Sequence, residues 1–118
     1  MNWFDSHCHL KGFKNKGNLE EILWRAEENG VSRMTAVGTS NDDWEIYKNL
    51  SEQYRDKIFY SVGLHPCYVN EGYESVIEKI ESYLGSGSPP VAIGEIGLDY
   101  FHLPNNHNEA LSIIKNQK

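Results

Sequence analysis

The 118 residues suffice for a single domain with a hydrophobic core, over residues 1–118, and the 39% hydrophobic and 24% charged composition is typical of a globular protein. The net charge of −6 argues against broad electrostatic binding to nucleic acid, but not against a nuclease whose metal ions supply the positive charge. No apolar run approaches the roughly 18 residues of a transmembrane helix, so no membrane partner is expected.

The N-terminus and the cysteines bear on the cellular compartment. Residues 1–5 have neither the basic nor the apolar region of a signal peptide, so a cytoplasmic location is predicted. Cys8 and Cys67 allow one disulfide, which a reducing compartment disfavours, and no C-x-x-C pair is present. We therefore interpret both cysteines as small space-filling residues rather than as thiolate ligands of zinc.

The first element of the chain carries the first candidate ligands. Residues 3–10 predict a β-strand in which Asp5, His7 and His9 point to the same face. Two imidazoles at this spacing can bind one metal ion. The alternative for so short a motif is two surface histidines that are close by chance.

Helices and strands alternate along the rest of the chain. A polar, glycine-flanked loop is predicted over residues 11–17. The helices are predicted by apolar periodicity and by N-caps at Asn18 and Ser40, each with an acidic residue three positions later (Glu21 and Asp43), and Gly30 fits the position that ends the first helix. Short apolar runs predict the strands. The expected helices lie over 19–29, 40–54 and 73–84, the strands over 34–37, 58–64 and 91–95, and a short last helix over 110–114. This β-α-β-α-β-α-β order predicts βαβ units and a parallel sheet.

Unusual polar residues stand where these strands end. His65 follows the third strand, Glu95 ends the fourth, and Asp99 lies just beyond it. The C-terminal ends of parallel strands form one edge, so these groups are expected near His7 and His9. Each has an ordinary alternative: His65 as a turn cap, Glu95 as the partner of a lysine, and Asp99 as a turn residue. Together they favour a site for Zn²⁺, Mn²⁺ or Mg²⁺, and two close metals would suit phosphoester hydrolysis.

Three segments of the chain together resemble a known family. They are Phe4-Asp5-Ser6-His7-Cys8-His9-Leu10, Val62-Gly63-Leu64-His65-Pro66 and Ala92-Ile93-Gly94-Glu95-Ile96-Gly97-Leu98-Asp99-Tyr100. Their order and spacing are similar to those of the TatD family of metal-dependent deoxyribonucleases, which are amidohydrolase-like TIM-barrel hydrolases. The resemblance covers about residues 2–101.

The resemblance implies roles for individual residues. His7 and His9 would bind one metal of a pair, and Glu95 would bridge both metals and so serve in catalysis. His65, the second catalytic candidate, would contact the substrate phosphate, and Asp99 would support the site. The implied reaction is phosphodiester hydrolysis by a metal-activated water, usually as a 3′-to-5′ exonuclease on single-stranded DNA, although some relatives act on RNA or misacylated tRNA.

The chain also departs from the family's pattern. A TIM barrel needs eight βα units and typically about 250 residues, whereas this chain supplies about four units. The family's two later ligand histidines and its late Ser-Asp motif are absent, and His102 and His107 match no ligand position. We therefore expect a partial (β/α)8 barrel, the N-terminal half of such an enzyme, that is weakly active or inactive alone.

A half barrel leaves its first and last strands as open edges. Completion by a second copy of the chain or by a separate C-terminal half is therefore expected, and a marginal, aggregation-prone fragment is the alternative. The alternative to a nuclease function is a non-catalytic half-barrel module for binding or assembly, or a truncated gene product without enzymatic function. A generic α/β domain that binds no metal is a further alternative interpretation.

Overall fold

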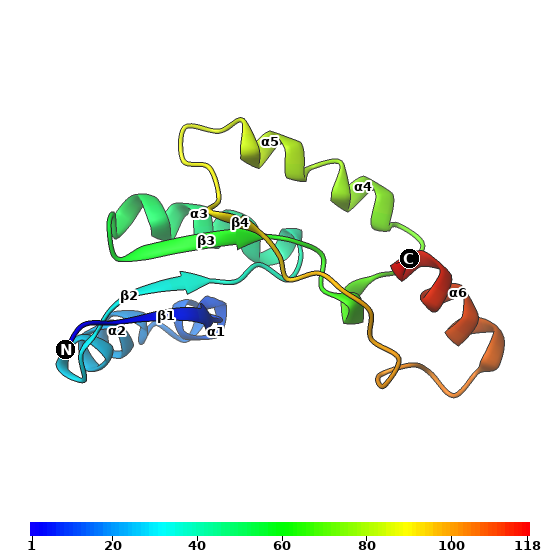
Figure 1. Cartoon of the computed structure of the whole chain (residues 1–118), viewed down its shortest axis with the longest axis horizontal. Helices are drawn as coiled ribbons and strands as arrows, with labels where there is room; N and C mark the ends of the chain where they lie inside the picture. Colours follow the sequence, from blue (N-terminus) through cyan, green and yellow to red (C-terminus); the bar gives the residue numbers. More distant parts are fainter.

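A four-stranded parallel sheet runs through the computed structural model, which describes residues 1–118 (Figure 1). The strands lie side by side in chain order, β1-β2-β3-β4, and all three pairings are parallel. The strand bounds are Trp3–Cys8 for β1, Val31–Ala36 for β2, Ile58–Val62 for β3 and Ala92–Ile93 for β4. The predicted partial (β/α)8 barrel of about four parallel βα units is therefore confirmed.

Helices connect and follow these strands. Their bounds are Lys11–Lys16 for α1, Leu19–Glu28 for α2, Asn41–Gln53 for α3, Tyr73–Ile77 for α4, Ile80–Leu84 for α5 and His107–Gln117 for α6, and a 3-10 turn, η1, spans Pro66–Tyr68. None of them combines the length and apolar character that crossing a membrane requires.

Four predicted elements differ from those observed. The predicted loop over 11–17 is the helix α1, whose six polar-rich residues contain Gly12 and show no helical periodicity. The predicted helix 73–84 is two short helices, α4 and α5, separated by two residues. The fourth strand has two residues rather than five, and the last helix starts at His107, after its cap Asn106.

Local capping accounts for the start of α3 and the end of α2. The predicted capping box at α3 is present, because the Ser40 side chain accepts a bond from the first turn and Asp43 accepts from the Ser40 backbone. Asn18 occupies the predicted N-cap position of α2, but its side chain makes no capping bond, so the predicted capping box is absent there. Gly30 follows α2 at φ 84°, in the left-handed region, as the sequence predicts.

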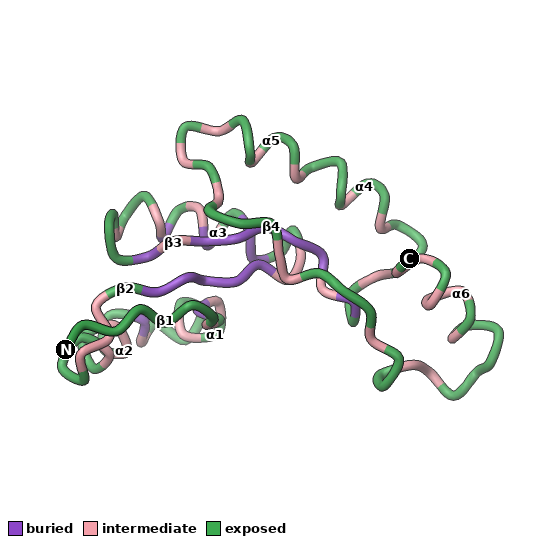
Figure 2. Tube along the Cα trace, in the orientation of Figure 1, coloured by how far each residue is buried: buried purple, intermediate pink, exposed green.

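The hydrophobic core lies between the two central strands and the helices beside them. Side chains on one face of β2 and β3 pack with Trp44, Tyr47 and Leu50 of α3. Only 18 of the 118 residues are buried, most of them along β2, β3 and α3, whereas β1 and β4 are largely exposed (Figure 2). On the opposite face, Phe4 and Phe59 stack with their ring centroids 5.8 Å apart. The sheet is thus covered on its helical face and open at both edges.

Candidate metal centre

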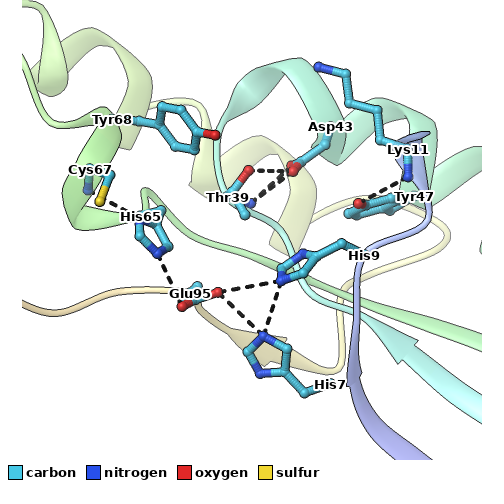
Figure 3. Close-up of a pocket in the computed structure, with 10 residues that line it drawn as sticks. All are labelled: His7, His9, Lys11, Thr39, Asp43, Tyr47, His65, Cys67, Tyr68 and Glu95. Carbon is cyan, nitrogen blue, oxygen red and sulfur yellow. Dashed lines mark hydrogen bonds and ion pairs between the residues drawn. The ribbon is translucent and has the colours of Figure 1, made fainter. Parts of the chain in front are cut away.

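The C-terminal ends of the strands bring the predicted site residues together. His7 and His9 lie at the end of β1, His65 lies three residues beyond β3, and Glu95 lies two residues beyond β4. The Glu95 carboxylate stands between His65 on one side and His7 and His9 on the other (Figure 3). One carboxylate is therefore within reach of three imidazoles that come from two distant parts of the sequence.

His7, His9 and Glu95 form a triangle of potential ligand atoms. The two histidine Nε2 atoms are 3.2 Å apart, and Glu95 Oε2 lies 3.4 Å from His7 Nε2 and 3.8 Å from His9 Nε2. Two ligand atoms at about 2.1 Å from a tetrahedral ion are about 3.4 Å apart. The triangle therefore has the size that a single bound ion requires.

Hydrogen bonds on the far side of the rings fix how two histidines present their nitrogens. His9 Nδ1 lies 3.1 Å from the Val37 carbonyl and donates to it, which leaves the Nε2 lone pair free for a metal. His65 Nδ1 accepts the Cys67 backbone N–H at 3.0 Å, so a neutral His65 carries its proton on Nε2. That Nε2 lies 3.2 Å from Glu95 Oε1. His9 is thus arranged as a ligand and His65 as a hydrogen-bond donor.

The backbone around Glu95 is held by the neighbouring strands. The Glu95 N–H donates to the Gly38 carbonyl at 2.7 Å. The buried Ser61 hydroxyl donates to the Gly94 carbonyl at 2.8 Å and accepts the Gly38 N–H at 3.1 Å. The ends of β2, β3 and β4 are thereby joined next to the carboxylate.

Gly63 lets β4 approach β3. A Cβ atom at Gly63 would lie 2.4 Å from the carbonyl carbon of Gly94. Such a distance is far below an ordinary contact, so the position of Glu95 depends on a residue without a side chain at the end of β3.

The site lies in an open cleft of about 460 Å³. Besides the histidines and Glu95, its lining includes residues that the sequence interpretation left out: Lys11, Thr39, Asp43, Tyr47 and Tyr68. Asp43 was predicted only as a helix cap, a role it fills through bonds to the Thr39 N–H and hydroxyl. Lys11 and Tyr68 each lie two residues beyond the H-x-H and His-Pro motifs, and this proximity is the signal that could have identified them.

The contacts of Glu95, His65 and Asp5 bear on the alternative role that each residue has from the sequence. Glu95 pairs with histidines rather than with a lysine. His65 does cap a turn, η1, while its other nitrogen points into the site. Asp5 lies on β1 but binds the His7 backbone N–H and is not part of the cluster, because the β1 register shifts between Asp5 and Cys8.

Asp99 and the cysteines lie apart from this triangle. Asp99 forms an Asx-type turn by accepting the N–H groups of Phe101 and His102. Cys8 packs against the core, as predicted, and burial raises the pKa of its thiol to about 12. For Cys67, however, the predicted space-filling role is wrong, because this residue is exposed and its thiol donates to Asp99 at 3.0 Å.

The chemistry of the donor set decides which ions the triangle fits. Two imidazoles and one carboxylate suit Zn²⁺ or Mn²⁺, whereas Mg²⁺ prefers sites made only of oxygen ligands. The three atoms converge from two strands without another side chain between them, and His9 already has the outer hydrogen bond typical of a ligand. The residues present therefore fit a divalent ion.

Comparison with known proteins places the chain beside one family. The sequence matches "TatD related DNase" over residues 4–117. It is 32% identical over 103 residues to the uncharacterized metal-dependent hydrolase YcfH of Escherichia coli, covering 85% of this chain and 37% of YcfH. It is 30% identical over 112 residues to the 3′-5′ ssDNA/RNA exonuclease TatD of Pectobacterium carotovorum, covering 92% of this chain and 43% of that protein.

A solved structure supports the same relationship. The TatD homologue YjjV of Escherichia coli superposes with a TM-score of 0.76 at 25% identity, covering 98% of this chain and 44% of YjjV. The chain thus spans about two fifths of the length of the relatives that it matches.

Proposed function

The chain belongs to the family of TatD related DNases, and from this membership we propose that it is a metal-dependent hydrolase of DNA phosphodiester bonds. The observation that carries the proposal is the triangle of His7 Nε2, His9 Nε2 and Glu95 Oε2, with sides of 3.2, 3.4 and 3.8 Å. We propose 3′-to-5′ exonuclease action on single-stranded DNA, because a relative is described as a 3′-5′ ssDNA/RNA exonuclease.

His7, His9 and Glu95 hold the metal in this proposal. Zn²⁺ and Mn²⁺ fit the donors best, Mg²⁺ remains a candidate, and a complete site of the family would hold two ions bridged by Glu95. A divalent ion bound there supplies an acidified water and positive charge for a phosphate oxygen. The metal thereby explains how a chain with net charge −6 accepts an anionic substrate.

His65 and Lys11 serve the phosphate in this proposal. His65 Nε2–H points into the cleft and can donate to a phosphate oxygen once a substrate displaces it from Glu95 Oε1. Lys11 lines the same cleft and adds a cationic donor. Both would orient the phosphodiester and neutralise charge that develops on its oxygens.

By itself the 118-residue chain would be weakly active or inactive, since it contributes only three ligand atoms to a site that needs more. A complementary C-terminal half, or a second copy of the chain, would supply the rest and close the barrel. The exposed edge strands β1 and β4 and the small core support this requirement. A cytoplasmic location stays a prediction from the sequence.

The second candidate function is a non-catalytic half-barrel module that serves assembly. The open edges and uncovered apolar side chains favour it as well, independently of the histidines. It differs from the first proposal in requiring no metal at His7, His9 and Glu95. Metal binding therefore separates the two.

The metal test uses Mn²⁺ titration of the purified chain, followed by electron paramagnetic resonance of the free ion. We expect one Mn²⁺ site that Glu95→Ala weakens by at least about a hundredfold, since even the outer partners of metal ligands are worth 10–100-fold in affinity. Glu52→Ala is the matched control, because Glu52 is exposed in the last turn of α3, at the opposite end of the strands. A wild-type chain that binds no Mn²⁺ would contradict the metal site.

The substrate test uses a single-stranded oligonucleotide labelled at its 5′ end. We expect Mn²⁺-dependent binding by fluorescence anisotropy, reduced in His65→Ala and lost in Glu95→Ala, and little shortening of the strand from its 3′ end. Robust shortening that Glu95→Ala abolishes would support the nuclease and overturn the proposed weakness of the lone chain. Mn²⁺ binding without any binding of DNA would contradict the substrate.

A further inference from the structure

A second cluster of metal-ligating side chains lies beside the cleft of Glu95, and its Cys67 also lines that cleft. The Cys67 thiol, the Asp99 carboxylate and the His102 imidazole converge, with one ligand atom from each within 4.8 Å of the others. Cys67 belongs to η1, whereas Asp99 and His102 belong to the segment that follows β4. The cluster therefore joins two parts of the chain that are more than 30 residues apart.

Two protons converge on one carboxylate oxygen in this cluster. The Cys67 thiol donates to Asp99 Oδ2 at 3.0 Å, and His102 Nδ1 donates to the same oxygen at 2.6 Å. Cys67 Sγ and His102 Nδ1 are 3.7 Å apart. A cation that displaces the thiol proton to solvent, and the Nδ1 proton to solvent or to Nε2 of the same ring, would meet a thiolate, a neutral imidazole and a carboxylate, whose combined charge of −2 balances a divalent ion.

The spacing and the surroundings suit a tetrahedral ion. Around zinc, sulfur and nitrogen ligands lie about 3.6 Å apart, close to the 3.7 Å observed, and the two shorter edges lengthen when the protons leave. A cavity of about 40 Å³ adjoins the three side chains, which is enough for a water molecule at the fourth position.

The loop that carries Asp99 and His102 is held in place from the other side. Gln117 of α6 accepts the Asp99 N–H at 3.0 Å, and its amide donates to the carbonyls of Asp99 and Pro66 at 3.2 Å each. This one side chain therefore fixes the loop against η1, where Cys67 lies. The cluster is preorganised by bonds that do not involve its own ligand atoms.

A catalytic thiol is the other chemistry that a Cys-His-Asp group suggests, and the geometry argues against it. A nucleophilic cysteine needs a lowered pKa and a base that takes its proton. The Cys67 thiol instead donates to the Asp99 carboxylate, and that hydrogen bond raises the pKa of Cys67. The imidazole of His102 is the more distant partner and is itself bound to Asp99.

We propose that Cys67, Asp99 and His102 form a second, mononuclear site for Zn²⁺ that is separate from the His7–His9–Glu95 triangle. The combination of thiolate, imidazole and carboxylate selects a borderline-soft ion over Mg²⁺ or Mn²⁺. The bound ion would clip the segment after Glu95 to η1, with water in the open position. This inference does not depend on the proposed nuclease activity, because the two sites use different ligands.

Co²⁺ substitution under reducing conditions tests the proposal, because only a thiolate ligand produces a sulfur-to-cobalt charge-transfer band in the near ultraviolet. We expect this band in the wild-type chain, its loss in Cys67→Ser, and its loss or marked weakening in His102→Asn. The band should persist in Cys8→Ser, which removes the other thiol, and in Glu95→Ala, which removes the first site. Circular dichroism verifies that the variants are folded.

Zn²⁺ equivalents, counted after desalting, give a second readout. Cys67→Ser and Glu95→Ala should each retain one equivalent fewer than the wild type, and the double variant two fewer. A missing charge-transfer band in the wild type, or a band that survives in Cys67→Ser, overturns the proposal. Equal zinc content in the wild type and Cys67→Ser overturns it as well.

Discussion

The position of Glu95 is set by main-chain contacts rather than by its side chain. Its N–H binds the Gly38 carbonyl, and Ser61 ties Gly38 to Gly94. Because β4 is only two residues long, few ladder bonds hold this segment. Small changes in the residues that contact Gly94 should therefore move the carboxylate away from the histidines.

Gly63→Ala tests this dependence. The added methyl group would lie 2.4 Å from the backbone of Gly94, so β3 and β4 must separate. We expect a loss of about 1–3 kcal/mol in the free energy of unfolding, measured by urea denaturation, which is the usual cost of overpacking. We also expect weaker Mn²⁺ binding at Glu95.

Gly87→Ala is the control for this substitution, since a methyl group there meets no atom within 4 Å. It should change neither stability nor Mn²⁺ affinity by a measurable amount. If Gly63→Ala lowered stability but left the Mn²⁺ affinity at its wild-type value, the close approach of the strands would not be what positions Glu95.

The site residues that could be predicted from the sequence are those at the ends of strands. His7, His9, His65 and Glu95 each stand at or after a recognisable apolar run, so the rule that parallel strands end at one edge placed them together. The cluster of Cys67 with His102 could not be predicted, because the loop after β4 has no periodic pattern and is held against η1 by Gln117, which is distant in the sequence.

At the scale of elements, strong local signals predicted structure well. The capping box at Ser40 marks the start of α3. The alternation of apolar runs with amphipathic stretches predicts the parallel βαβ order that the structure has. The α1 helix was missed because tertiary contacts, not local periodicity, form it. The Tyr47 hydroxyl accepts the N–H groups of Leu10 and Lys11, which are free at the start of this helix.

The contact between α5 and α3 gives a prediction for alkaline pH. The Tyr83 hydroxyl donates to Glu45 at 3.0 Å and its ring packs edge-on against Trp44. Burial, and then the Glu45 carboxylate, raise the pKa of Tyr83 from 10.0 to about 12. The unfolded chain therefore ionises first, binds fewer protons than the native chain, and becomes more favoured as the pH rises from about 10 to about 12.

Urea unfolding between pH 8 and pH 11.5 measures this effect. We expect the wild type to lose stability above pH 10 and Tyr83→Phe to lose less, because the variant has no phenol to ionise at this position. Tyr100→Phe, at an exposed position, should follow the wild-type curve. Parallel curves for the wild type and Tyr83→Phe would show that the contact with Glu45 does not hold the phenol neutral.

At the scale of the whole molecule, the parallel half barrel buries only a small share of its apolar side chains. Buried residues are confined to β2, β3 and the elements that pack on them, while the apolar side chains of Trp3, Phe4, Ile96 and Leu98 are each about half exposed. Both edges of the sheet present unpaired backbone groups. The sequence predicted this openness from the number of βα units.

Self-association of the purified chain is the expected consequence. A two-fold axis along the barrel would place β4 of one copy beside β1 of the other while keeping every strand parallel, so two copies could close the sheet. We expect light scattering coupled to size exclusion to give masses above the 13.5 kDa of one chain, rising with concentration.

Phe4→Lys tests whether the β1 edge mediates this association. Phe4 is 46% exposed on the open face, stacked on Phe59, so a charge there should repel a second strand without removing a residue of the core. The variant should therefore shift toward the mass of a single chain. Trp24→Lys, which exchanges an aromatic residue that is 62% exposed on α2, should associate like the wild type. A wild-type chain that stays monomeric at every concentration would contradict closure by a second copy.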